Sequence, residues 1–206
     1  MDSDWFHKAV EGNRGHEQAK RSAAEHLQPP KMSLESVEYS IDQCKKYKIL
    51  VPENPQSQSP ASAAYRVLRT RLLHRARSNK WATLGISSPG QGEGKSLTAL
   101  NLALSVARAG NHNVCLIDLD LRRPKIWRSL GAKPPREITD FLTDTAPPEE
   151  VLFSIGIQNL MVGGAVTGTS DASELLTGPR IRELLSFIRR NVPNAMILAD
   201  LPPLLS

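Results

Sequence analysis

The sequence lacks the features of membrane-inserted, secreted and disulfide-stabilised proteins. No stretch of the 206 residues approaches 18 consecutive apolar residues, so we expect no transmembrane helix. The first residues, Met1-Asp-Ser-Asp4, contain neither the basic nor the apolar region of a secretory signal. Two cysteines, Cys44 and Cys115, lie far apart in unrelated contexts. They predict neither a disulfide framework nor a metal site, and they fit a reducing cytosol.

Acidic residues are missing from one segment, residues 61–80, which carries six Lys/Arg and no Asp/Glu. The rest of the chain is nearly balanced, so this segment accounts for the net charge of +5. A protein that binds nucleic acid would be basic over a broader surface. We therefore expect no nucleic-acid partner, and we interpret the segment as a local contact with a subunit or a membrane partner. A solvated helix face is the alternative interpretation.

Composition divides the chain near residue 60. Residues 1–60 are predicted to form a polar N-terminal arm, disordered over residues 1–28, with a short helix at Leu34–Ile41. A proline-rich linker, Val51–Pro60, closes the arm. The second predicted unit, residues 61–206, has the alternating pattern described next.

Short apolar strands alternate with helices after residue 60. Ser59 and Pro60 are typical of a helix start, and the helix Ala61–Arg77 would bury Tyr65, Leu68, Leu72 and Ala76. Strands are predicted at residues 82–87, 113–118, 159–162 and 195–199, and helices at residues 95–108, 124–130, 138–142, 173–176 and 179–190. Alternation of this kind predicts an α/β fold with a mostly parallel sheet covered by helices on both faces.

The strongest motif is Ser87-Ser-Pro-Gly-Gln-Gly-Glu-Gly-Lys-Ser96, which lies between a predicted strand and a predicted helix. Its glycines let backbone N–H groups turn inward around phosphate, and the helix start adds its positive dipole end. We expect Lys95 to reach the terminal phosphates and the Ser96 hydroxyl to bind Mg²⁺. A flexible turn with a surface lysine is the alternative. The candidate nucleotide-binding residues are Gly90, Gln91, Gly92, Glu93, Gly94, Lys95, Ser96 and Leu97.

Three carboxylates follow predicted strands. Asp118 and Asp120 end one strand in the run Leu116-Ile-Asp-Leu-Asp120, and Asp200 ends the last strand. Parallel α/β sheets bind ligands at this end of their strands. Because two adjacent carboxylates repel, we expect them to share a cation or a substrate hydroxyl. Helix capping and simple solvation are the alternatives.

Together these motifs resemble the bacterial tyrosine kinases of capsule and exopolysaccharide synthesis, which belong to the deviant P-loop ATPases with MinD and ParA. The resemblance covers about residues 63–203 and includes Gly163-Gly164 and Ser173-Glu-Leu-Leu176. It implies a P-loop kinase domain over residues 61–206 that takes ATP and Mg²⁺. The resemblance implies that Lys95, Asp118 and Asp120 are catalytic, and that Asp118 activates the tyrosine hydroxyl. Ser96, Asp118 and Asp200 are the metal residues it implies.

The resemblance also implies partners. It suggests a membrane-embedded co-polymerase as activator, a cytoplasmic location at the inner face of the plasma membrane, and subunit contacts through Arg66 and Arg69. Ala63 stands where the family has a glutamate, so we expect weak, salt-dependent association. The family continues beyond the position of Ser206 and ends in a tyrosine cluster, so we expect this domain to be C-terminally incomplete. Two alternatives stay open: a non-catalytic nucleotide-binding regulator and a partitioning-type ATPase.

Overall fold

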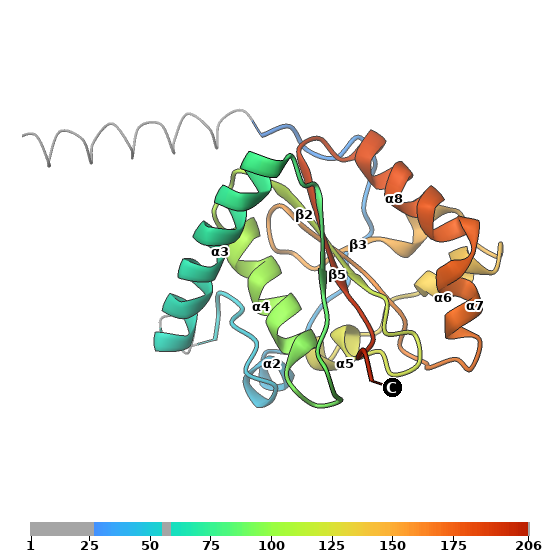
Figure 1. The fold of residues 1–206 in the computed structure, drawn as a ribbon, viewed down its shortest axis with the longest axis horizontal. Coiled ribbons are helices and arrows are strands. Elements are labelled where there is room, and N and C mark those ends of the chain that lie inside the picture. The colour runs from blue at the N-terminus through green and yellow to red at the C-terminus, as the bar shows by residue number, and fades with distance from the viewer. Residues whose placement is uncertain (1–26, 55–58, 206) are drawn as a thin grey trace, which may run out of the picture.

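A five-stranded sheet in the order β1-β5-β2-β4-β3 forms the centre of the protein (Figure 1). The computed structural model describes residues 27–54 and 59–205. All strand pairs are parallel except β3 with β4. The strands are β1 (Thr83–Ile86), β2 (Asn113–Asp118), β3 (Phe153–Ser154), β4 (Leu160–Gly163) and β5 (Ala195–Asp200). The predicted mostly parallel α/β sheet is thus confirmed.

Helices cover both faces of this sheet (Figure 1). On one side lie α2 (Ile41–Lys46), α3 (Pro60–Asn79), α4 (Lys95–Ala107) and α5 (Ile126–Leu130). On the other lie α6 (Ile138–Leu142), α7 (Ala172–Thr177) and α8 (Pro179–Asn191), and a 3₁₀ helix spans Pro148–Val151. Each side has its own buried apolar cluster. Strand β2 is buried along its whole length, as expected for a central parallel strand.

Residues 27–54 belong to the fold of the sheet domain. The predicted helix at Leu34–Ile41 is wrong, because this stretch is extended: the Val37 N–H donates to the Ser154 carbonyl at 2.8 Å. Pairing with β3 supplies the hydrogen bonds that a helix would have supplied. The observed helix α2 starts at Ile41, with Ser40 as its N-cap. The boundary at residue 60 stays a prediction, although the described part of residues 1–60 shares its core with the rest.

The predicted linker also contributes to this core. Val51 is fully buried, and the buried Asn54 side chain donates to the Ile49 carbonyl at 2.7 Å. Most of the stretch predicted to be disordered, residues 1–26, lies outside the described residues, as do residues 55–58. Within the described residues, no helix has the length and apolar character needed to cross a membrane.

Helix α3 starts as predicted, with Ser59 as N-cap and Pro60 in the first turn. Its predicted apolar stripe is only partly right. Ala76 is buried, but Leu68 is 40% exposed. The Arg69 guanidinium instead reaches inward and donates to the Ser105 carbonyl of α4 at 3.0 Å. A polar contact therefore anchors the middle of this helix.

Strand β1 pairs with β5 on one side. On its other side, no strand within the described residues continues the sheet. The strand that precedes the phosphate loop is therefore an edge strand of the described sheet. Trp81, just before β1, is 50% exposed near this edge. An exposed strand edge of this kind favours association between chains.

Candidate functional site

Register between strands brings the carboxylates together. Asp118, at the end of β2, lies opposite Asp200, at the end of β5, and Asp200 lies opposite Ile86 of β1. The phosphate loop leaves β1 directly after Ile86. The loop and both carboxylates therefore meet at the carboxyl edge of the sheet, where parallel α/β proteins bind ligands. This is the grouping that the sequence predicts.

The phosphate loop has the backbone shape that anion binding requires. Gly92 and Gly94 have φ values of +79° and +86°, which other residues rarely adopt, and a Cβ at either position would point into open space. Gly94 is also the N-cap of α4 and makes no side-chain cap, so the first N–H groups of a thirteen-residue helix face the loop. The Gly90 N–H donates to the Glu93 carboxylate at 3.1 Å. The Gln91 side chain accepts from Arg123.

Lys95 is buried among carboxylates. Its Nζ lies 2.6 Å from an Asp120 oxygen and 3.5 Å from an Asp200 oxygen. All three side chains are 6% exposed or less. A buried ammonium needs such partners, since an unpaired charge away from water is costly. Lys95, Asp120 and Asp200 therefore form one buried ionic cluster, hereafter the lysine cluster.

Asp118 adjoins this cluster and is fully buried. One of its oxygens accepts the N–H of Asp120 at 3.1 Å, and the other accepts those of Lys125 and Ile126 at 2.8 and 3.0 Å. Burial and then repulsion from Asp200 raise the pKa of Asp118 to about 7, although the backbone donors oppose this rise. A carboxyl group with that pKa can exchange a proton near neutral pH. Asp118 also binds the N–H groups at the start of α5, which is the helix-capping role given above as an alternative.

Ser96 and Asp200 carry the polar atoms that a cation could use. Among the described residues, the Ser96 hydroxyl and both Asp200 oxygens are buried and make no hydrogen bond, although the Lys95 amine lies 3.5 Å from one Asp200 oxygen. Burial raises the pKa of Asp200, and nearby Ser96 and Lys95 oppose the rise. Oxygen atoms of this kind fit Mg²⁺, which binds through one or two protein oxygens together with phosphate oxygens. Within the described residues no group of three or more His, Cys, Asp or Glu side chains could hold a metal by itself.

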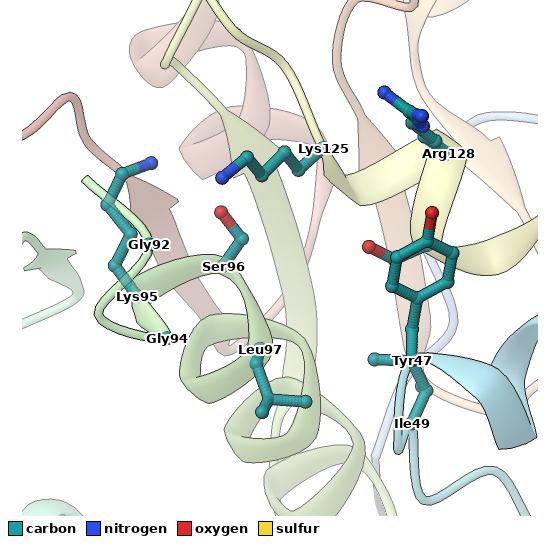
Figure 2. Close-up of a pocket in the computed structure, with 10 residues that line it drawn as sticks. Tyr47, Ile49, Gly92, Gly94, Lys95, Ser96, Leu97, Lys125 and Arg128 are labelled. Carbon is teal, nitrogen blue, oxygen red and sulfur yellow. The ribbon is translucent and has the colours of Figure 1, made fainter.

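A cavity of about 350 Å³ opens beside the loop (Figure 2). Gly92, Gly94, Lys95, Ser96 and the predicted Leu97 line one side of it. Residues that sequence reasoning missed line the rest: Tyr47, Ile49, Lys125, Arg128 and Ser129. Figure 2 shows the Lys125 amine extending toward the Ser96 side of the cavity. Lys125 and Arg128 follow the Asp118 motif closely in the sequence and could have been found from it. Tyr47 is distant from every motif and gave no such signal.

Comparisons with known proteins find tyrosine-protein kinases among the chains similar to this one. No family model matches the chain. CpsD of Streptococcus pneumoniae, a tyrosine-protein kinase, is 31% identical over 130 residues, which are 61% of this chain and 55% of that protein. YwqD of Bacillus subtilis, also a tyrosine-protein kinase, is 28% identical over 151 residues, which are 73% of this chain and 62% of that protein. The chain thus spans little more than half the length of these curated relatives.

A solved structure covers a larger share. The kinase domain of VpsO is 30% identical, with a TM-score of 0.61, over 71% of this chain and 70% of that domain. This chain is therefore similar to a kinase domain in both its sequence and its fold, over more than two thirds of that domain.

Proposed function

Because the chain belongs to the bacterial tyrosine kinases of capsule and exopolysaccharide synthesis, we propose that it is an ATP-dependent protein-tyrosine kinase that regulates such synthesis and export. The observation that carries this proposal is the meeting of the phosphate loop with Asp118 and the lysine cluster at one sheet edge. Phosphoryl transfer requires mainly positioning and neutralisation of charge, and this edge offers donors, a cation and carboxylates for both.

In the proposed mechanism the chain's own groups hold the nucleotide. Loop N–H groups of residues 90–97 and the Lys95 ammonium bind the phosphates. Ser96 and Asp200 would hold Mg²⁺, with Asp118 close by, and Mg²⁺ when bound would neutralise charge on the phosphates. On nucleotide binding, Lys95 would exchange part of its contact with Asp120 for phosphate oxygens.

We assign the acceptor proton to Asp118. An ionised carboxylate has about four lone-pair positions. Backbone donors use three of them, two on one oxygen and one on the other. The position left over can accept the hydroxyl proton of a tyrosine, and the raised pKa suits that transfer. Asp120 acts in this scheme by holding Lys95.

One observation favours a second function, a non-catalytic nucleotide-binding regulator of a polysaccharide co-polymerase. Asp118 is fully buried and already engaged by three backbone N–H groups, which a purely structural residue would also show. The chain also contains only three tyrosines. In this alternative the loop binds ATP and the carboxylate does no chemistry.

Labelled ATP with Mg²⁺ and a tyrosine-containing peptide separates these functions. Label on tyrosine supports the kinase, bound nucleotide without transfer supports the regulator, and release of free phosphate alone indicates an ATPase. Lys95→Ala should lower ATP affinity by about tenfold or more, since it removes a charge-assisted contact. Asp118→Asn should abolish transfer and keep ADP binding. Unchanged ATP affinity in Lys95→Ala would show that the phosphate-loop assignment is wrong.

We further propose that α3 makes the subunit and partner contacts. Arg66 and Arg69 are the candidate contact residues, and a membrane-embedded co-polymerase is the candidate activator at the inner face of the membrane. Arg69 already donates to Ser105, so Arg66 is the freer of the two. Arg66→Glu should weaken any oligomer, whereas Arg75→Glu is the matched control. Sedimentation at low and high salt measures this, and a salt-independent monomer would contradict the proposal.

A further inference from the structure

The open edge of β1 carries backbone groups that no other strand of the described sheet uses. The Ala82 and Ile86 carbonyls both point to the β5 side, where they accept backbone N–H groups at 2.9 and 2.8 Å. Because neighbouring residues of a strand direct their backbone groups to opposite sides, Thr83 and Gly85 direct theirs toward the open edge. This edge therefore offers the hydrogen-bonding side of a strand to an incoming segment.

A groove of about 730 Å³ lies between α3 and the start of β1. Its apolar lining residues are Leu68, Leu72, Trp81 and Leu84. Trp81 is 50% exposed and Leu68 is 40% exposed. Large apolar side chains that gather in one exposed place are typical of a surface that binds another chain.

Basic side chains border this groove. Arg71 and Arg75 line it, and no Asp or Glu is among its described lining residues. Both arginines are exposed, and none of the ion pairs in the described part of the chain includes them. On the α8 side of the sheet, the Arg189 guanidinium donates to the Thr83 hydroxyl at 3.0 Å. A strand added at this edge would therefore have cations near both of its faces.

A second copy of the chain fits this edge poorly. Pairing of β1 with β1 would bring two sets of the same arginines together, and like charges at close range repel. A segment with acidic side chains would instead pair with these arginines. Exposed tryptophan and arginine are also the residue types that contribute most to binding at protein interfaces. The charges therefore favour an acidic partner over a second copy.

We propose that the β1 edge and the adjoining groove bind an extended segment of a partner protein, in which apolar residues are flanked by acidic ones. The backbone of the segment pairs with Thr83 and Gly85, and its apolar side chains occupy the groove beside Trp81. Its acidic side chains lie against Arg71 and Arg75. This groove shares no lining residue with the phosphate-loop cavity, so the inference does not depend on the proposed kinase function.

The probe for this surface is the acetylated peptide Glu-Glu-Val-Phe-Val-Glu-Glu, added to the full chain. Fluorescence anisotropy of the labelled peptide measures its affinity, and amide hydrogen exchange followed by NMR locates it on the chain. We expect binding that weakens as salt rises, because the contacts include ion pairs. We also expect slower exchange at the Thr83 and Gly85 N–H groups, since added backbone hydrogen bonds protect them.

Charge reversal tests the cations of the groove. Arg71→Glu with Arg75→Glu should weaken peptide binding by about tenfold or more, since it replaces two attractions with two repulsions. Lys45→Glu with Lys133→Glu is the matched control, because it changes the net charge equally at exposed positions that do not line the groove. It should leave the affinity within about twofold of the parent. Trp81→Ala should weaken binding by about fivefold or more.

The parent chain decides the inference even where a variant folds poorly. Equal binding of a peptide with lysine in place of every glutamate would show that the charge complementarity is wrong, and no binding of the acidic peptide would overturn the inference altogether. Peptide binding without slower exchange at Thr83 and Gly85 would overturn the pairing with β1. Slower exchange there as the concentration of the peptide-free chain rises would place a second copy at this edge instead of a partner.

Discussion

The segment before α3, residues 27–54, and helix α3 itself differ in an instructive way. The segment has weak periodicity in the sequence, yet Val37, Cys44, Ile49 and Val51 are all buried in the core. Helix α3 has clear helix signals, yet the buried residues of its twenty are only Ser62 and Ala76. Local sequence pattern therefore predicts backbone conformation well and burial poorly, because burial depends on which distant residues offer a surface.

The largest loss of stability should come from shortening a buried side chain of the segment, residues 27–54. Ile49→Ala is expected to lower the free energy of unfolding by about 2–5 kcal/mol, since it leaves a cavity under α4 and the phosphate loop. Leu68→Ala, at a 40%-exposed position of α3, should cost less than about 1 kcal/mol. Urea unfolding of both variants measures the difference. Equal losses would contradict the contrast between the two regions.

The next effect concerns the polar link between the segment and α4. The Asn101 side chain accepts the Leu50 N–H at 2.8 Å and donates to the Lys48 carbonyl at 3.1 Å. Asn101→Ala should cost about 1–3 kcal/mol, because it leaves a buried backbone N–H without its acceptor.

Asn79 of α3 provides the matched control for Asn101. Its side chain donates to the Arg75 carbonyl from an exposed position, so Asn79→Ala should change stability by about 0.5 kcal/mol or less. Thermal unfolding of the two variants compares them, and a larger loss in Asn79→Ala would reverse the expected order.

These links explain what the sequence could and could not predict. The strands at residues 113–118 and the helices from residues 95 and 179 follow from apolar runs and capping residues, and they appear within one or two residues of expectation. The extended stretch at Val37 and the two-residue β3 do not, because the stretch is held by pairing with β3, and β3 by pairing with β4 and with this stretch. Asn101 gave no sign of its role, since its partners lie about fifty residues away.

A smaller effect should distinguish the arginines within α3. Arg69 is half-buried, donates to the Ser105 carbonyl and has a pKa lowered first by burial and then by Arg66. Arg69→Ala should cost about 1 kcal/mol, because it removes this contact between α3 and α4. Arg75→Ala, at an exposed position, is the control and should be near neutral. Denaturant midpoints decide it, and identical values would mean that α3 is held by apolar contacts alone.

The smallest effect is a pH dependence that reports the charge of α3. Burial first, and Arg77 of α3 in addition, lower the pKa of His112 below its ordinary 6.5, while Asn194 opposes them. The unfolded chain therefore binds this proton more readily, so the free energy of unfolding should decrease as pH falls below about 6.5. Arg77→Gln should raise the pKa of His112 by less than about one unit.

NMR titration of the His112 ring measures this shift, with Arg71→Gln as the control for a general loss of charge. If the pKa of His112 is the same in Arg77→Gln as in the parent, the positive charge of α3 does not affect the loop before β2.

The candidate site shows the same division between local and distant signals. Lys95, Ser96 and the aspartates stand in short motifs, and the parallel sheet determines where those motifs meet, so the sequence could group them. Tyr47 could not be found this way, because its place in the cavity depends on the turn after α2 and on the contact between α2 and α5. The engagement of Asp118 by backbone donors likewise depends on the path of the loop before α5.

The pairing of Asp118 with Asp200 across β2 and β5 determines where the chain can change length. Side chains alternate between the two faces of a strand, so one residue inserted into β5 before Asp200 would turn this carboxylate away from Lys95. Insertions in the connections between strands leave that alternation intact. Homologous sequences should therefore vary in loop length while the spacing from the start of β5 to its terminal aspartate stays constant.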